Sequence, residues 1–255
     1  MSDEPVLLSE DDGVLTITFN RPQARNAVNQ ALAESVAAAL DRLDAEDGLR
    51  IGIVTGAGGY FCAGMDLKAF VSGERPWAGD RGFAGITQRS SRKPLIAAVE
   101  GFALAGGFEV ALSCDLIVAA RGARFGIPEV KRGLIAAGGG LIRLPKRIPY
   151  HLAMELALTG DPVQAERAYE IGIVNRLTEP GAALGGAREL AGAIVPNAPL
   201  SLELSKEIVQ RTSDWTEAEA WEKAGELGTR AFSSEDAQEG AKAFAEKRAP
   251  QWKGR

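Results

Sequence analysis

The 255-residue sequence lacks the residues that would place it in several common classes of protein. It contains two cysteines, Cys62 and Cys114, and a single histidine, His151, which are too few for a disulfide framework or a cysteine–histidine metal site. Its formal net charge is −5, whereas general nucleic-acid binding requires a basic face. We therefore expect buried thiols in a reducing compartment, no metal and no nucleic-acid partner.

Targeting and nucleotide-binding signals are also missing. Residues 1–5 are acidic and lack the basic and apolar regions of a signal peptide. No run approaches the ~20 apolar residues that span a bilayer. A dinucleotide fingerprint starting at Gly56 would need a glycine at Phe61, and no P-loop lysine follows. These absences predict a cytoplasmic protein without a membrane partner or a nucleotide cofactor.

The sequence does contain enough apolar residues for one substantial core with an appendage, because 45% of its residues are hydrophobic and 25% are charged. Its 30 glycines stand at the ends of apolar runs, which is typical of tight turns. Periodicity and capping signals predict strands over 6–8, 14–19, 51–55, 95–99, 116–120 and 173–177, and helices over 29–46, 154–158, 164–170, 185–194, 202–211, 215–232 and 235–248. The turn signal Asp11-Asp12-Gly13 predicts that the first two strands form a hairpin. A glycine loop over 134–140 is expected to precede a basic helix with Arg143, Lys146 and Arg147.

Two segments differ from this regular pattern. Residues 71–92 have weak periodicity, and we interpret them as a mobile loop with a short helix that shapes a specificity pocket. Trp77 and Phe83 are candidates for lining that pocket, with simple surface exposure as the alternative. From Leu200 onward the sequence predicts helices alone, and no linker separates them from the rest.

Residues 94–129 carry the strongest chemical signal, and within them residues 101–107 and 125–129 are predicted to form turns. Glu109 and Glu129 both stand in apolar sequence, where lost hydration raises the pKa of a carboxyl group towards the range useful for acid and base catalysis. The structural alternative is that each glutamate pairs with an arginine or caps a helix. Gly106-Gly107, which opens a helix near Glu109, favours a site, because free N–H groups and the helix dipole attract negative charge.

A similar glycine turn occurs earlier in the chain. Ala63-Gly64 and Ala105-Gly106 each precede the predicted start of a helix. Two such turns predict two main-chain N–H groups aimed at one oxygen atom, the arrangement called an oxyanion hole. Alternatively, each is only a tight connection between a strand and a helix.

With these residues identified, the chain resembles the enoyl-CoA hydratase/isomerase (crotonase) family over nearly its full length. The order and spacing of the matching segments carry the resemblance, and its closing segments resemble mycobacterial-type enoyl-CoA hydratases and carnitinyl-CoA dehydratases. The matching segments are Asn20-Arg21-Pro22 with Asn26-Ala27, Phe61 to Leu67, Pro94 to Gly101, Ala105 to Glu109, Cys114-Asp115, Phe125 to Glu129, Leu158 to Gly160, Phe244 to Arg248 and Trp252 to Arg255.

The resemblance implies an α/β crotonase (ClpP-like) fold, a spiral of ββα units followed by a helical region that mediates trimers, often paired into hexamers. On this basis we expect residues 1–195 to form the spiral core with the active site. Residues 196–255 are expected to form the helical region.

The resemblance also implies a site. It assigns the oxyanion hole to Met65 and Gly106, and acid/base catalysis to Glu109 and Glu129. Substrate contacts are expected at Ala24, Arg25, Ala63, Asp66, Leu67, Lys68, Gly138 and Gly139, with Arg25 and Lys68 as cations for the phosphates of coenzyme A. The expected reaction is reversible hydration of a trans-2-enoyl-CoA to a 3-hydroxyacyl-CoA. Coenzyme A is then part of the substrate, and no cofactor is expected.

Several alternatives stay open. The same fold could serve three other functions. They are a carnitinyl-CoA dehydratase or racemase, an enoyl-CoA isomerase and a non-enzymatic acyl-CoA binding scaffold. The sequence departs from the family pattern at Ala105, at Met65 and in the loop 135–140, which leaves the acyl preference undetermined.

Overall fold

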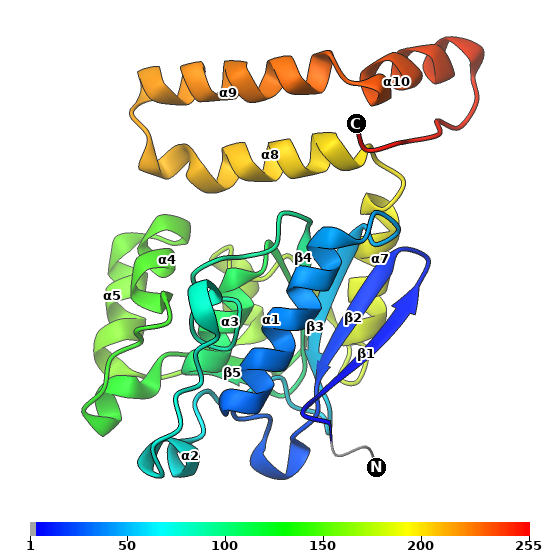
Figure 1. The fold of residues 1–255 in the computed structure, drawn as a ribbon. Coiled ribbons are helices and arrows are strands. Elements are labelled where there is room, and N and C mark those ends of the chain that lie inside the picture. Colours follow the sequence, from blue (N-terminus) through cyan, green and yellow to red (C-terminus); the bar gives the residue numbers. More distant parts are fainter. Residues whose placement is uncertain (1–3) are drawn as a thin grey trace.

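The computed structural model describes residues 4–255 and has a core of two sheets and flanking helices, with a further layer of helices on one side (Figure 1). Residues 1–3, part of the segment searched for a signal peptide, lie outside the described residues. Within residues 4–255, no helix is both long enough and apolar enough to cross a membrane.

The larger sheet begins with the predicted hairpin. Asp12 and Gly13 connect its two strands with positive φ angles of 45° and 77°, as a tight hairpin turn requires. All the other neighbouring strands in this sheet are parallel. The strands, in spatial order, are β1 (Val6–Asp11), β2 (Val14–Phe19), β3 (Ile51–Gly56), β4 (Leu95–Val99), β6 (Leu116–Ala120) and β9 (Arg176–Thr178).

The smaller sheet corrects two predictions. Residues 101–107 and 125–129 were expected to be turns, but part of each forms a strand, β5 (Phe102–Leu104) or β7 (Arg124–Gly126). These two strands pair in parallel, and β8 (Val163–Gln164) pairs with β7 in the antiparallel direction. Each strand is too short to be recognised locally, because long-range pairing defines it.

The larger sheet is covered on both faces. Alternate β4 residues point to opposite sides, so that Ile96 and Ala98 join one hydrophobic cluster and Leu95 and Val99 join the other. The cluster around Ile96 is completed by α7 (Ala183–Ile194). Helices α1 (Gln30–Ala45) and α3 (Gly106–Ser113) contribute to the other cluster.

The predicted helical pattern is largely confirmed. Asn29 caps α1 by accepting a hydrogen bond from the N–H of Leu32, and Ser234 caps α10 in the same way. The other α-helices are α2 (Leu67–Val71), α4 (Gly140–Arg147), α5 (Tyr150–Thr159), α6 (Ala165–Glu170), α8 (Pro199–Arg211), α9 (Glu217–Phe232) and α10 (Glu235–Glu246), and the 3₁₀ helices are η1 (Pro22–Ala24), η2 (Gly79–Arg81), η3 (Pro128–Arg132) and η4 (Thr212–Asp214).

The C-terminal helices α8, α9 and α10 form the separate layer visible in Figure 1, and no strand occurs between Pro199 and the C-terminus. None of the α9 residues is buried within this chain, although Trp221 and Phe232 are large and apolar. The division of the chain after residue 195 stays a prediction.

The segment 79–92 is packed against the core, although we expected a mobile loop. Residues 81–87 are all buried. Arg81 is held by Asp41, at 2.7 Å, and by Asp44, at 3.2 Å, both on α1. Because the buried guanidinium of Arg81 anchors this segment to α1, the side chains of the segment hold fixed positions.

Candidate active site

The smaller sheet explains why the two glutamates meet. Strand β5 leads into α3, which carries Glu109, and β7 leads into η3, which carries Glu129. Because β5 and β7 are parallel neighbours, their carboxyl ends lie at the same edge of the sheet. The elements that follow these strands, α3 and η3, therefore place both carboxyl groups on one side of the core.

The two glycine turns lie against each other, as their common layout predicts. Cys62 and Ala103 form an isolated parallel bridge, so the two segments run side by side. A Cβ atom on Gly64 would lie only 3.0 Å from the main-chain nitrogen of Gly106. The N–H groups of Met65 and Gly106 thus belong to adjoining turns, and their convergence on one oxygen atom stays a prediction.

Ala105 turns the chain from β5 into α3. Its backbone has φ 51° and ψ −130°, a conformation that glycine adopts much more easily than alanine. Its N–H donates to the carbonyl oxygen of Gly126 at 2.9 Å, which ties the turn to β7. Gly106 follows as the first residue of the helix, where an N–H group has no acceptor within the helix.

An aromatic ring covers the second turn. A Cβ atom on Gly106 would lie 2.5 Å from two ring atoms of Phe83, so glycine makes room for the ring. The ring of Trp77, which is partly exposed, meets that of Phe83 edge-on at 5.5 Å between centroids. Of the two residues predicted to line a specificity pocket, Phe83 therefore lies against the turn Ala105-Gly106, called the oxyanion turn below, and Trp77 lies next to Phe83.

Glu109 is buried, with 3% of its surface exposed. Its Oε1 accepts a hydrogen bond from the N–H of Gly140 at 2.8 Å. Desolvation raises the pKa of Glu109, while the N–H groups of Gly140 and Gly138 and the positive charge of Arg143 oppose that rise. The predicted rise in the pKa of Glu109 is confirmed, and the two N–H groups and the positive charge still stabilise its carboxylate form.

Three successive glycines form the cradle of this carboxylate. A Cβ atom on Gly138 would lie 2.6 Å from Oε2 of Glu109, and one on Gly140 would lie 3.2 Å from Oε1. Gly139 has φ +104°, which side chains disfavour, and a Cβ atom there would lie 2.1 Å from Nη1 of Arg143. Gly138 and Gly140 therefore leave room for Glu109, and Gly139 leaves room for Arg143.

Glu129 has a different environment. Its Oε2 is buried and has no hydrogen-bond partner among the described residues. Desolvation, with a contribution from the negative charge of Glu109, raises the pKa of Glu129 to about 7. The two carboxyl groups are thus close enough to repel each other, and Glu129 loses its proton only as the pH rises through about 7.

The segments expected to bind coenzyme A are adjacent. The N–H of Ala63 donates to the carbonyl oxygen of Arg25 at 3.1 Å, beside Ala24. Asp66 pairs with Arg21 at 3.0 Å and caps α2 at the N–H groups of residues 68 and 69. The side chains of Arg25 and Lys68, like Leu67, are exposed, and within residues 4–255 neither cation has an ion-pair partner.

Gly138 and Gly139 were expected to contact substrate, and the structure places both in the cradle of Glu109. The substrate contact stays a prediction. Our sequence reasoning did not assign Gly140 or Arg143 to the site, although it noted the glycine loop and the basic helix that contain them. A run of three glycines followed by an arginine one turn later was the available signal.

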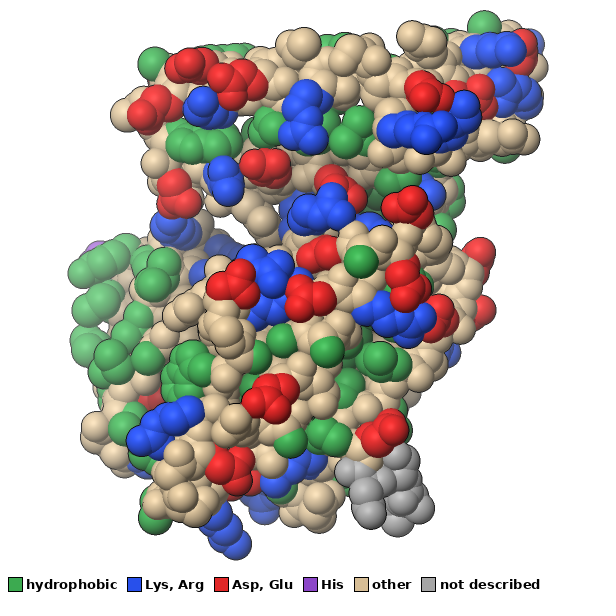
Figure 2. All heavy atoms as spheres, viewed as in Figure 1, with side chains coloured by type: hydrophobic (Ala, Val, Ile, Leu, Met, Phe, Trp, Pro, Cys, Tyr) green, Lys and Arg blue, Asp and Glu red, His purple; other side chains and the backbone are tan. Residues whose placement is uncertain are grey.

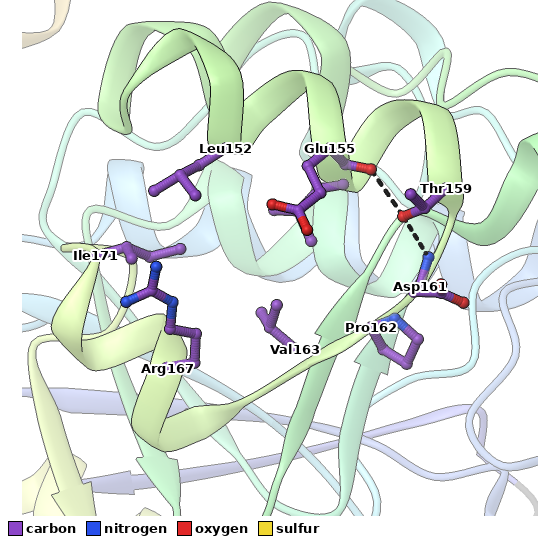
Figure 3. A pocket seen from close by; sticks show the side chains of 9 residues that line it. Leu152, Glu155, Thr159, Asp161, Pro162, Val163, Arg167 and Ile171 are labelled. Carbon is purple, nitrogen blue, oxygen red and sulfur yellow. Dashed lines mark hydrogen bonds between the residues drawn. The ribbon is translucent and has the colours of Figure 1, made fainter.

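A cavity of about 330 Å³ between α5, β8 and α6 does not belong to this site (Figure 3). Neither Glu109 nor Glu129 lines it. Glu155 and Arg167 line it together with Val163, and Arg167 already pairs with Glu170 at 3.0 Å. We assign it no role in the chemistry considered below.

Comparisons with known proteins show the family to which the chain belongs. The family model described as enoyl-CoA hydratase/isomerase matches residues 9–255, so the chain belongs to that family. It is 44% identical to the enoyl-CoA hydratase EchA19 of Mycobacterium tuberculosis, over 94% of this chain and 93% of that protein. It is 42% identical to a carnitinyl-CoA dehydratase of Proteus mirabilis, over 97% of this chain and 98% of that protein.

A solved structure confirms the fold. The crystal structure of the enoyl-CoA hydratase EchA1 from Mycobacterium marinum superimposes with a TM-score of 0.97 at 56% identity, covering 99% of this chain and 100% of that one. The fold is therefore the crotonase fold, and the names of these relatives are those of hydro-lyases.

Proposed function

We propose that this protein is an enoyl-CoA hydratase, which adds water reversibly and with syn geometry to a trans-2-enoyl-CoA and gives a 3-hydroxyacyl-CoA. The observation that carries the proposal is a pair of glutamates, the buried Glu109 and the half-buried Glu129, which have unlike environments at one edge of the smaller sheet. The two adjoining glycine turns supply the second half of the machinery.

The glycine turns act on the thioester. Addition of water to the β-carbon sends negative charge to the thioester carbonyl oxygen, and the N–H groups of Met65 and Gly106 stabilise the resulting enolate. Removing one such donor typically raises a barrier by ~2.7–4 kcal/mol. The close packing of Gly64 on Gly106 supports this assignment, because it fixes one donor relative to the other.

The glutamates divide the proton transfers. Glu109, whose carboxylate is supported by two N–H groups and a guanidinium, takes a proton from the attacking water. Glu129, with a pKa of about 7, delivers a proton to the α-carbon. Unlike environments that separate the pKa values of paired carboxyl groups are a general sign of such acid and base roles.

Coenzyme A binds across the adjoining segments 24–28 and 63–68. Its phosphates are anionic, and the exposed, unpaired side chains of Arg25 and Lys68 offer positive charge there. Charge-assisted contacts of this kind fix a ligand without entering the chemistry.

The test is turnover of crotonyl-CoA, followed by loss of the ultraviolet absorbance of the conjugated thioester, with the 3-hydroxyacyl product identified by mass spectrometry. We expect turnover by the unaltered protein and a loss of about 10²–10⁴-fold in Glu109→Gln and in Glu129→Gln, with acyl-CoA binding retained. Binding without turnover would instead identify an acyl-CoA scaffold, and double-bond migration would identify an isomerase.

A carnitinyl-CoA dehydratase is the second candidate. The aromatic pair Trp77 and Phe83, of which Phe83 lies against Gly106, favours it, because aromatic faces bind a trimethylammonium group. Comparing crotonyl-CoA with crotonobetainyl-CoA separates the two activities. A preference for the betaine substrate that Trp77→Ala abolishes would replace the first candidate with the second.

We also propose that residues 196–255 act as an oligomerisation region, giving a trimer or a pair of trimers. Large apolar side chains are exposed on α9 and α10, and Figure 2 shows a second group of apolar side chains over α4 and α5. Those on α9 and α10 are Trp221, Phe232 and Phe244, and those on α4 and α5 include Leu141, Ile142, Tyr150 and Leu158. Light scattering coupled to gel filtration measures the assembly, and a monomer at micromolar concentration would refute it.

A further inference from the structure

Arg143 connects the two halves of the candidate site. It lies on the first turns of α4, and its guanidinium is half-buried between that helix and two loops. Nη1 donates to the carbonyl oxygen of Gly138 at 3.2 Å. Nη2 donates to the carbonyl oxygen of Thr87 at 2.5 Å. One side chain thus bridges segments that are about 50 residues apart in the sequence.

The first contact supports Glu109. Gly138 and Gly140 flank the carboxylate, and their N–H groups face it only while the turn between them keeps its shape. Gly139, at the centre of the turn, has φ +104°, and Nη1 of Arg143 occupies the space that a side chain would need there. The guanidinium and the turn therefore fix each other.

The second contact supports the oxyanion turn. The N–H of Thr87 donates to the carbonyl oxygen of Phe83 at 3.2 Å. The ring of Phe83 lies directly against Gly106. Arg143 thus holds, through Thr87 and Phe83, the wall beside the N–H group proposed to bind the thioester oxygen.

We propose that Arg143 is a positioning residue, whose guanidinium holds the Gly138–Gly140 turn around Glu109 in register with the Phe83 wall of the oxyanion turn. This inference rests on the proposed hydratase activity. It goes beyond that activity because Arg143 touches no reacting atom and acts through the groups it orients.

The charge of Arg143 also affects the pKa of Glu109, which a purely structural contact would leave unchanged. Around Glu109 the charged groups are Glu129 on η3, which repels it, and Arg143 on α4, which lowers its pKa. Arg132 acts on Glu129, and Arg147 faces Arg143. Removing the Arg143 charge should therefore raise the pKa of Glu109 and move the acidic limb of the kcat/KM profile to higher pH.

The experiment compares Arg143→Lys and Arg143→Met with the control Arg147→Met. The control also removes one positive charge from α4, one helical turn further along, but the Arg147 side chain makes no hydrogen bond among the described residues. Arg143→Lys keeps the charge and loses the two-armed contact. We expect its kcat to fall about tenfold with the acidic limb unmoved. Arg143→Met should lose about a hundredfold, as misplaced reacting groups do, with the limb at higher pH.

Circular dichroism and thermal unfolding first establish that each variant is folded. Arg143 variants that are folded and retain the kcat and pH profile of Arg147→Met would overturn the inference. If Arg143→Met does not fold, the lysine variant decides: a reduced kcat supports the positioning role, and an unchanged kcat refutes it.

A measurement without substrate separates this inference from the proposed function. Carbon NMR of labelled glutamate side chains, with the Glu109 signal assigned by its loss in Glu109→Gln, follows the titration of that carboxyl group. We expect its pKa to be higher in Arg143→Met than in Arg147→Met, and equal values would overturn the inference. Absence of turnover in the unaltered protein would refute the hydratase proposal and leave this titration to decide on Arg143.

Discussion

The cradle of Glu109 is tested most directly by adding one methyl group, in Gly138→Ala. Gly138 has an ordinary backbone conformation, so alanine is not excluded by the backbone. The added Cβ would lie 2.6 Å from Oε2 of Glu109, whereas ordinary van der Waals contact begins near 3.4 Å. The carboxylate or the turn must then move by about 0.8 Å, since a non-bonded contact this short is repulsive.

A displacement of this size sets the expected magnitude. A reacting group misplaced by about 1 Å can lose about a hundredfold in rate. We therefore expect kcat of Gly138→Ala to fall between about tenfold and a hundredfold, which corresponds to about 1.4–2.7 kcal/mol of barrier.

The assay is the steady-state hydration of crotonyl-CoA, with thermal unfolding of the same samples. The matched control is Gly48→Ala, at a glycine whose added Cβ would meet nothing within 4 Å and whose φ is not positive. The control should keep the kcat of the unaltered protein. If Gly138→Ala also kept it, Glu109 would not need the position that we assign to it, and the reasoning about the cradle would be wrong.

Three further predictions concern stability. Ala105→Gly should relieve a positive φ that costs roughly 1–3 kcal/mol, against a loss of about 0.5–1 kcal/mol from the added backbone freedom; a midpoint of thermal unfolding that does not rise would contradict this. Arg81→Met should cost roughly 3 kcal/mol in urea unfolding, the lower end for a broken buried ion pair because Asp41 is partly exposed, and a cost under 1 kcal/mol would exclude an anchoring role. Glu129 has a pKa raised from 4.5 to about 7, so its contribution to stability is present below 4.5 and is lost as the pH rises towards and past 7. Glu129→Gln should therefore be more stable than the unaltered protein near pH 8 and lose that advantage near pH 4. If the variant and the unaltered protein had the same unfolding midpoint at each of these pH values, the raised pKa of Glu129 would be refuted.

The elements that sequence reasoning predicted well are those with local signals. The hairpin of β1 and β2 follows from an Asp-Gly turn between apolar runs, and α1 follows from its cap at Asn29 and its apolar spacing. The burial of Glu109 and the rise of its pKa also followed locally, because its neighbours along α3 are apolar and the whole helix is buried.

The smaller sheet was missed because its signal is not local. Phe102–Leu104 and Arg124–Gly126 are each three residues long, and the first follows a glycine while the second ends in one, a composition typical of turns. They become strands through pairing with each other and, for β7, with β8 some 40 residues later. This sheet brings Glu109 and Glu129 to one edge, so the sequence indicated the candidate residues without the element that joins them.

The contacts around the glutamates were beyond sequence reasoning for the same reason. Gly140 and Arg143 lie about 30 residues beyond Glu109, and nothing in the spacing shows which N–H group meets which oxygen. The loop 135–140 attracted notice only as a departure from the family pattern. In the structure its glycines explain how a carboxylate can be buried and still be supported.

The different roles proposed for two identical side chains also arise at this level. Both glutamates follow strands of the same small sheet, and desolvation raises the pKa of each. Only Glu109 receives N–H donors and a nearby guanidinium, while Oε2 of Glu129 has no partner among the described residues. Because hydrogen bonds to the ionised form stabilise it, the first environment favours a base and the second an acid. Exchanging those environments, rather than the side chains, would be needed to exchange the roles.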